Sequence, residues 1–336
     1  MKTFISKNQP QYKANLHCHS VRSDGKLTAD QLKEAYKNHG YSVLAITDHE
    51  VPHDYSDLSE KDFLMLTGYE AYIRKPDHNV NSQEIHTCLI SKQPHNLKYV
   101  NYDKNLCKYL TEEQQNELEK IGVEGPRSYS VEYINSFVET ARENGYMCTY
   151  NHPAWSLELY EQISQYRGFF SMEMYNHSSN IINSMEYNGQ LYDRLLREGN
   201  RIFTHATDDN HNKFPFDSPE CDSFGGFTMI LSEELTYPSV IEALECGNFY
   251  SSMGPVINEL TFDGNKVHIE TSNAKQITML MGGKATRRVL GTKDAPVTCA
   301  DFEIPTFAPY VRFNILDFEG NRADTRGFFR DELQLD

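Results

Sequence analysis

The stretch that decides the fold is residues 12–49, which reads YKANLHCHSVRSDGKLTADQLKEAYKNHGYSVLAITDH. The run at 12–18 predicts a strand, and YSVLAIT at 41–47 predicts a second, buried strand. Between them, residues 28–39 have the spacing of an amphipathic helix, with Thr28 as the N-cap and Gly40 as the stop. Strand, helix and strand in this order predict parallel strands, in an α/β barrel or an open sheet.

The same alternation of apolar runs and helical patterns continues to about residue 255. Further strands are predicted at 63–66, 84–90, 146–150, 169–174, 202–206 and 227–231, and further helices at 130–144, 185–198 and 238–246. Residues 100–127 are polar and helix-prone, and we interpret them as an insertion over the mouth of a barrel.

The pattern changes after Met253-Gly254-Pro255. Short alternating runs follow, with turn signals at Asp263-Gly264 and Glu319-Gly320. We therefore expect two domains, an α/β unit over 1–255 and a small antiparallel, sandwich-like β-domain over 256–336 in which no chemical motif is seen.

Composition excludes several classes of protein. The net charge of -16 argues against a nucleic-acid polymer as the partner, because phosphates repel an acidic surface. No apolar run approaches the roughly 20 residues of a membrane helix, and the N-terminus lacks the apolar core of a secretory signal. The seven irregularly spaced cysteines fit free thiols in a reducing cytoplasm. We expect a cytoplasmic protein with a small-molecule substrate, and the oligomeric state stays open.

Chemistry is first indicated by His17 and His19. Residues two apart in a strand face the same side, so both imidazoles can reach one metal ion. Asp24 follows in the loop SDGK, where its carboxylate can turn toward them. Cys18, between the two histidines, is expected to point away into the core.

More ligand-type side chains follow the other predicted strands. They are His49 in TDH, Glu70 in TGYE, His152 in NHP, and Asp209 and His211 in DDNH, while His86 lies within a strand. Imidazole and carboxylate together favour Zn, Mn or Fe over calcium. Because one ion does not need so many ligands, a site with two or three metals is predicted, of a kind suited to phosphoryl transfer.

These motifs, HxHxxxxDG, TDH, GxE, NHP and DxH in this order, resemble the polymerase-and-histidinol-phosphatase (PHP) family over roughly residues 13–255. The β-rich tail is similar to PHP proteins of the group that includes carbaryl-type hydrolases. The resemblance implies a distorted (β/α)7 barrel with two or three metal ions at the carboxyl ends of its strands.

The resemblance also implies which residues hold each ion. By motif, the first ion falls to His17, His19, Glu70 and Asp209, the second to Asp24, His49 and His211, and the third to Glu70, His86 and His152. His78 is the alternative to His86. Some members of the family have His at the position of Asp24, and a carboxylate there favours Mn or Fe somewhat more.

Other residues near the motifs are candidates with a plainer alternative. For catalysis these are Asp48 (or a helix cap), His177, and His205 with Asp208 (or packing), beside the ligands His49 and His211. For substrate binding they are Arg22 (or a surface residue), Asn176, His177 and Trp155 (or core).

The expected reaction is hydrolysis of a phosphomonoester or small phosphodiester by a hydroxide that bridges two metals. The alternatives are hydrolysis of a carbamate, amide or carboxylic ester at the same metals, and a metal-binding module without catalysis. Residues 74–83, 100–127 and 212–223 are expected to set specificity.

Overall fold

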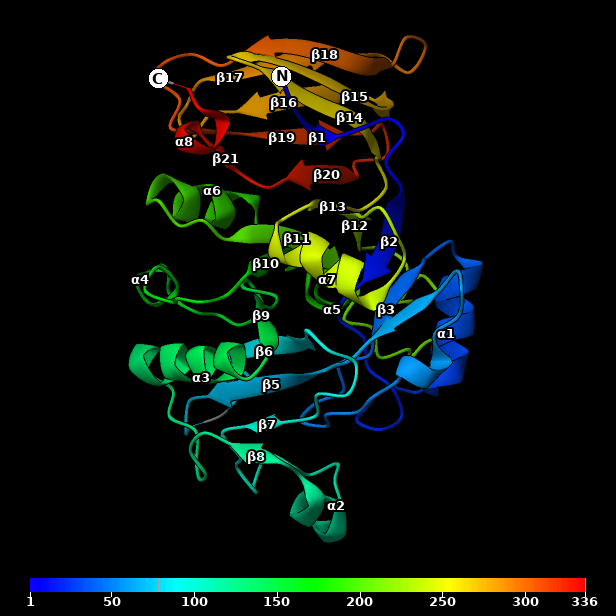
Figure 1. Cartoon of the computed structure of the whole chain (residues 1–336), viewed down its shortest axis with the longest axis vertical. Helices are drawn as coiled ribbons and strands as arrows, with labels where there is room; N and C mark the ends of the chain where they lie inside the picture. Colours follow the sequence, from blue (N-terminus) through cyan, green and yellow to red (C-terminus); the bar gives the residue numbers. More distant parts are fainter. Residues whose placement is uncertain (78, 186, 336) are drawn as a thin grey trace.

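The computed structural model describes residues 1–77, 79–185 and 187–335 and has a mixed α/β fold (Figure 1). His78, the alternative ligand to His86, lies outside these residues. The strands are β1 (Lys2–Ile5), β2 (Gln11–Asn15), β3 (Val43–Ala45), β4 (Leu64–Leu66), β5 (Gly68–Arg74), β6 (Glu84–Ser91), β7 (Tyr99–Val100), β8 (Lys120–Ile121), β9 (Tyr146–Tyr150), β10 (Ser171–Asn176), β11 (Phe203–Thr207), β12 (Phe227–Leu231), β13 (Phe249–Ser252), β14 (Ile257–Asp263), β15 (Lys266–Ala274), β16 (Gln276–Leu280), β17 (Thr286–Leu290), β18 (Val297–Glu303), β19 (Tyr310–Leu316), β20 (Arg322–Thr325) and β21 (Phe328–Phe329). The helices are η1 (Ser56–Leu58, a 3-10 turn), α1 (Ala29–Asn38), α2 (Glu112–Glu117), α3 (Val131–Glu143), α4 (Tyr160–Ile163), α5 (His177–Asn183), α6 (Gly189–Arg197), α7 (Tyr237–Glu245) and α8 (Arg330–Leu333).

The first strand–helix–strand unit forms as its sequence predicts. Thr28 caps α1: its hydroxyl accepts a hydrogen bond from the backbone of Gln31, whose side chain accepts one from the backbone of Thr28. Leu32 and Tyr36 face the core. The helix returns the chain so that β2 and β3 lie parallel, with Ala14 opposite Val43.

Two sheets carry the α/β part of the chain. One has the order β11-β10-β9-β6-β5, and the other runs β17-β16-β19-β20-β13-β12-β2-β3-β4. Isolated bridges join the chain beyond the strands of one sheet to the other, among them Cys18 with Asn210 and His49 with Glu70. Within the described residues the strands form no closed barrel, so the (β/α)7 barrel stays a prediction.

The expectation of parallel strands is right for β2, β3 and β4 and for β9, β10 and β11, but it is wrong for other pairs in both sheets. β5 and β6 pair antiparallel, as do β6 and β9, and β12 pairs antiparallel with β2. The physical reason at β5 and β6 is the short connection 75–83. A parallel crossover needs a dozen or more residues, whereas an antiparallel pair needs only a turn.

Residues 100–127 contain less helix than expected. They hold α2 and the short parallel pair β7–β8, and they extend to the lower end of the molecule (Figure 1). Their own small apolar cluster centres on Tyr99, Tyr102 and Cys107. A buried ion pair anchors the segment, because Arg127 Nη2 lies 3.0 Å from Glu50 Oε2, one residue after His49.

The C-terminal part is rich in strands, as expected. A four-stranded sheet, β1-β14-β15-β18, shares an apolar core with β16 and β19, through side chains such as Leu260, Ile269, Met279 and Phe313. Two pairings cross residue 255: β1 joins β14, and β13 joins β20. The 1–255 and 256–336 boundary stays a prediction, with the first strand of the chain lying in the second unit.

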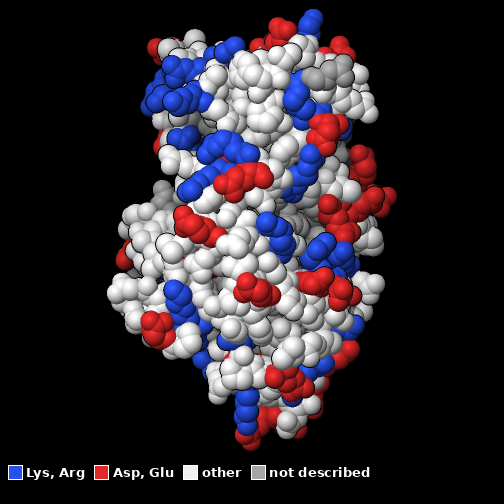
Figure 2. All heavy atoms as spheres, turned by 90° about the vertical axis from the view of Figure 1, so that its left-hand side faces the viewer, with Lys and Arg blue, Asp and Glu red and all other residues white. Residues whose placement is uncertain are grey.

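On the face formed by α3, α4 and α6, acidic and basic side chains are interspersed, and basic ones gather at the upper end (Figure 2). Among the described residues, none of the helices has the length and apolar character needed to span a bilayer.

A buried arginine joins α6 to the C-terminal strands. Arg312 donates two hydrogen bonds to the carboxylate of Asp193, at 2.8 and 2.7 Å, and one to Asp324 at 2.6 Å. Only 2% of Arg312 is exposed. The guanidinium therefore compensates two carboxylates that would otherwise be poorly solvated.

We predict that Arg312→Ala lowers the free energy of unfolding by about 3–5 kcal/mol, because it leaves buried charge without a partner. Urea denaturation measures this change. The control, Arg287→Ala on the exposed strand β17, should stay within about 0.5 kcal/mol of the parent. A loss below about 1 kcal/mol for Arg312→Ala would contradict the assignment.

Candidate metal centre

Backbone pairing brings the ends of β2 and β11 together. His19 N donates to Asn210 O at 3.0 Å, and Asp209 N donates to His17 O at 3.0 Å. The side chains consequently converge, with Asp209 Oδ1 lying 3.1 Å from His17 Nε2 and 3.0 Å from His19 Nε2.

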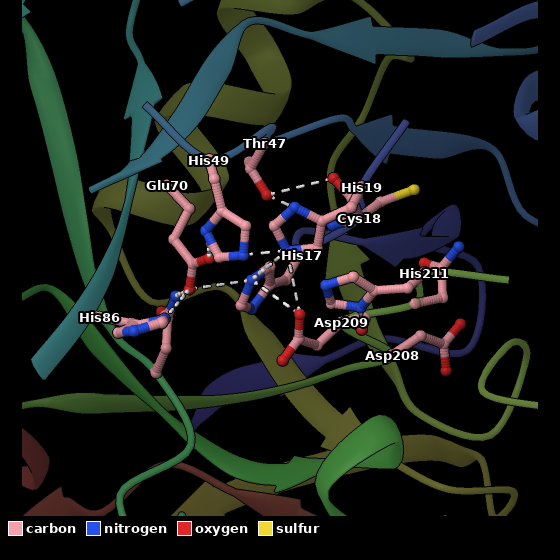
Figure 3. Close-up of polar contacts among 12 residues, drawn as sticks. His17, Cys18, His19, Thr47, His49, Glu70, His86, Asp208, Asp209 and His211 are labelled. Carbon is pink, nitrogen blue, oxygen red and sulfur yellow. Dashed lines mark hydrogen bonds and ion pairs between the residues drawn. The ribbon is translucent and has the colours of Figure 1, made fainter. Parts of the chain in front are cut away.

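Glu70 lies at the centre of the cluster. The bridge between His49 and Glu70 places their side chains together, with His49 Nδ1 2.8 Å from Glu70 Oε2. Glu70 Oε1 lies 3.1 Å from His17 Nε2 and 3.2 Å from His86 Nδ1. Figure 3 shows these side chains pointing toward one another, while the sulfur of Cys18 points away. Cys18 packs in the apolar core, as predicted.

Glu70 differs from its expected setting. It lies inside β5 rather than at the end of a strand, and His86 faces it from the antiparallel neighbour β6. His152 completes this side, with its Nε2 3.6 Å from Glu70 Oε1.

Asp24 reaches the cluster through a tight loop. A side chain at Gly25 would lie 2.2 Å from the carbonyl oxygen of His19, so only glycine fits after the aspartate. Asp24 Oδ1 then lies 3.4 Å from His211 Nε2 and 3.8 Å from His49 Nε2.

The carboxylate of Asp48 contacts a loop rather than an imidazole or a helix end. Its carboxylate accepts hydrogen bonds from Ser20 N, Ser20 Oγ and Ser23 Oγ, each at 2.7 Å, and from Tyr55. Asp48 thus holds the loop that carries Asp24.

All nine predicted ligands meet in one place, and the arrangement fits divalent metal ions. Four overlapping groups have donor atoms within 4.8 Å of one another: His19, Asp24, His49 and His211; His17, His19 and Asp209; His17, Glu70 and Cys88; and His49, Glu70 and His86. Within the described residues, His19 Nδ1 is buried without a hydrogen-bond partner, while His49 Nδ1 and Asp24 Oδ1 have only the charged contacts given above, with Glu70 and with His211 and His49. Unsatisfied donors and acceptors of this kind fit a bound cation.

The pKa shifts of the clustered side chains also fit a site that binds cations. Burial alone would raise the pKa of Glu70, but His17, His86 and His49 hold it well below its usual range. Burial would lower the pKa of His86, yet Glu70 and Glu84 raise it to about 10. In His17 too, Asp209, Cys88 and Glu70 outweigh burial and raise the pKa. Without cations, protons on these imidazoles compensate the carboxylates.

Glu173 supports the ligands from within β10. Its Oε1 lies 2.8 Å from His17 Nδ1, and its Oε2 accepts a hydrogen bond from His152 N at 2.6 Å. Asn176 was expected to line the pocket, but it is buried and donates to Glu173 and Asp209. Both residues therefore fix the orientation of ligands.

Sequence reasoning missed Cys88 and Asn151. Cys88 shares a face of β6 with His86, two residues away, and this spacing was the available signal. Its sulfur accepts a hydrogen bond from Asn151 Nδ2 at 3.2 Å, and burial raises the pKa of the thiol. Asn151 Nδ2 also donates to Glu70 Oε1 at 2.8 Å, so it orients that carboxylate.

Three other candidates lie outside the cleft. His205 is buried against Ser171, and burial lowers its pKa to about 4, so it is neutral and packs. His177 bonds Tyr175, and its ring fills the space beside Gly225. Arg22 is exposed and faces the ring of Tyr55 at 6.0 Å. Their roles in catalysis or substrate binding stay predictions, and none of the three residues lines the cleft.

Asp208 also packs rather than reaching the ligands. Its carboxylate accepts hydrogen bonds from the backbone of residues 224–226 and from the hydroxyl of Tyr36. The alternative of packing, rather than proton donation, fits this position.

An open cleft of about 340 Å³ leads to the ligands. Trp155 forms one wall, as expected, with its ring 4.8 Å from that of His152 and 5.2 Å from that of His86. Ile182 and Lys213 also line it. The floor is held rigidly, because His152 and Asp209 have left-handed backbones (φ 26° and 53°), which side chains other than glycine adopt only under constraint.

A further group, Glu259, His268 and Glu270, lies on the C-terminal sheet. There Lys7 Nζ lies 2.8 Å from Glu270 and 3.3 Å from Glu259, so a cationic side chain already compensates these carboxylates.

Histidines and carboxylates gathered beside strand ends in an α/β chain are typical of metal-dependent hydrolases. The PHP domain family model matches residues 15–203, more than half of the chain. The chain therefore belongs to the PHP domain family.

Two solved structures are similar at low sequence identity. A two-domain protein from Bacteroides vulgatus ATCC 8482, described as containing a predicted PHP-like metal-dependent phosphoesterase, is 14% identical, with a TM-score of 0.47 and 96% of each chain covered. A candidate metal-dependent phosphoesterase from Bifidobacterium adolescentis ATCC 15703 is 16% identical, with a TM-score of 0.40, and the match covers 71% of this chain and 97% of that one. No curated protein matches the chain.

Metal affinity should rise with pH between about 6 and 8. His17 and His86, whose pKa values are raised, hold protons at neutral pH in the metal-free protein, and ligation must displace them. The carboxylates, whose pKa values are lowered, are already ionised there. Calorimetric titration with Mn or Zn in two buffers of different ionisation enthalpy measures the protons released. Affinity independent of pH, with no proton release, would contradict this assignment.

Replacing Glu173 with Gln should weaken metal binding about 10- to 100-fold, because the amide no longer fixes His17 as a carboxylate does. Metal competition against a fluorescent chelator measures the change. Glu158→Gln is a matched control, since this buried carboxylate accepts from tyrosines instead of holding a ligand. Equal affinities in both variants would exclude the positioning role of Glu173.

Proposed function

We propose that the chain hydrolyses phosphate esters, either phosphomonoesters or small phosphodiesters, with two or three divalent metal ions. The observation that carries this proposal is the convergence of nine His, Asp and Glu side chains, seven of which line one open cleft together with Lys213. Membership of the PHP domain family supports it. The preferred ions are Mn, Zn or Fe, which suit mixed imidazole and carboxylate ligands.

Bound metal ions would activate water and neutralise charge on a phosphoryl group. We divide the ligands among the ions by motif, and the overlapping donor groups support this division: His17, His19 and Asp209 lie together, His19 also lies with Asp24, His49 and His211, and Glu70 lies with His17 and with His49 and His86. Glu70 is therefore placed to bridge ions. Glu173 and Asn151 keep His17 and Glu70 in their orientations through the reaction.

The residues that line the cleft would contact different parts of a substrate. Lys213 places a positive charge beside the ligands, where it attracts an anionic ester and stabilises the charge that develops on it. Trp155 and Ile182 present an apolar surface to the organic part of the ester. No described Ser or Cys needs to act as a nucleophile, because activated water suffices.

Two further expectations, a barrel-like fold and a cytoplasmic location, belong to the proposal. The strands around the cleft are regarded as a distorted relative of the (β/α)7 barrel, which the bridges of Cys18 with Asn210 and of His49 with Glu70 support. A cytoplasmic location is supported by seven cysteines that are all free.

Protein loaded with Mn should hydrolyse 4-nitrophenyl phosphate, and His211→Ala should lower kcat/KM by about 100-fold or more, because a ligand is lost. His95→Ala, an exposed histidine that pairs with Asp54, is the control and should keep its activity.

A parallel assay of a bis-phosphodiester and a naphthyl carbamate separates the reaction classes. Hydrolysis of the carbamate alone would replace phosphate-ester chemistry with carbonyl chemistry at the same metals. A purified protein with no bound or activating metal would overturn the whole proposal.

A further inference from the structure

A second, smaller pocket adjoins the metal cluster. It has a volume of about 140 Å³ and shares Asp24, His49 and His86 with the cluster, while Arg74 and Lys108 form its outer part. This is the volume of roughly five water molecules in the liquid, which suits one phosphate or carboxylate group but not a large organic one.

Arg74 enters this pocket because of the alternation of β5. Glu70, Tyr72 and Arg74 share one face of the strand. Along this face, Tyr72 lies next to the predicted ligand Glu70, and Arg74 lies beyond Tyr72. Across the hairpin, Tyr72 lies opposite His86, and Arg74 lies opposite Glu84. Positions two apart are separated by about 6.6 Å along a strand, so Arg74 lies about 6.6 Å beyond Tyr72 and about 13 Å beyond Glu70 along β5.

Lys108 comes from a different part of the chain and is exposed. It belongs to the segment 100–127, which the buried pair of Arg127 and Glu50 anchors directly after His49. Tyr99, at the start of the same segment, also donates a hydrogen bond to Glu50. The anchor therefore ties Lys108 to the loop that carries a predicted metal ligand.

Both cations lack a carboxylate partner among the described residues. Glu84 lines the pocket as well, but its Oε2 lies 3.6 Å from His86 Nε2, on the side of the ligands. The guanidinium of Arg74 lies over the ring of Tyr72, 4.6 Å from its centre. Lys108 likewise contacts an aromatic ring, that of Tyr109, at 4.9 Å. Two positive groups that no described residue pairs, beside a site for a metal-bound ester, form a receptor for an anion.

We propose that Arg74 and Lys108 bind a second anionic group of the substrate, a carboxylate or phosphate distinct from the ester that is hydrolysed. This inference rests on the proposed function, and it narrows the substrate class to esters that carry an additional negative charge a few bonds away. Arg74 provides planar, two-pronged hydrogen bonding, and Lys108 provides a point charge from the opposite segment.

The kinetic test compares phenyl phosphate with its 3-carboxy and 4-carboxy derivatives on the metal-loaded enzyme. The parent should prefer one carboxylated ester by about tenfold or more in kcat/KM, as expected for hydrogen bonds to charged groups. In Arg74→Gln/Lys108→Met this ratio should fall to near 1. Lys104→Met, which removes the same charge from an exposed position in the same segment, should keep the preference of the parent.

A binding test separates failure of this inference from failure of the proposed function. Calorimetry measures the affinity of phenylphosphonate and of 3- and 4-carboxyphenylphosphonate, which cannot be hydrolysed. Tighter binding of a carboxylated phosphonate by the parent, lost in the double variant, supports the pocket even if no ester is turned over. Equal affinity of the parent for all three phosphonates overturns it, even if phenyl phosphate is hydrolysed.

Discussion

The buried carboxylate of Glu70 is the constraint on which the rest of the structure depends. It is 1% exposed, and imidazoles of His17, His49, His86 and His152 surround it at 2.8 to 3.6 Å. Burying a charged carboxylate costs free energy unless positive groups compensate it. Here the compensating imidazoles come from four separate places in the sequence. The strands must therefore bring these places together. The bridges of Cys18 with Asn210 and of His49 with Glu70, and the backbone pairs between the ends of β2 and β11, follow from that requirement.

Much of the local structure and the full predicted ligand set could be read from the sequence. The helix after Thr28 has its capping box, and His17 and His19 share a face because strands alternate. What escaped prediction depends on partners distant in sequence. Nothing local shows that β5 turns back onto β6, that Glu173 bonds His17, or that Asp48 organises the loop of Asp24. Periodicity identifies the faces of elements, but it does not say which faces meet.

The surroundings of the ligands explain how one cluster can be selective. The predicted ligands come from strands, strand ends and the loop of Asp24, which are held by backbone pairing and by buried residues such as Glu173, Asn151 and Asp48. The groups that would touch the rest of a substrate come instead from longer connections: Lys108 from the segment 100–127, Trp155 after β9 and Lys213 after β11. Such connections tolerate sequence change far better than the strands do. Substrate preference can thus change while the metal chemistry is kept.

The pairing of β13 with β20 gives the C-terminal strands a role in the integrity of the whole chain. Tyr250 and Thr325 are neighbours in the same ladder that continues through β12 to β2, the strand that leads to His17. A chain ending at residue 255 would leave β13 as an open edge, and β1 would lose its only paired neighbour among the described residues, β14. Unpaired edges invite pairing with other molecules and aggregation. Transfer of residues 1–255 to another protein would therefore require the C-terminal strands, residues 256–336, to be transferred as well.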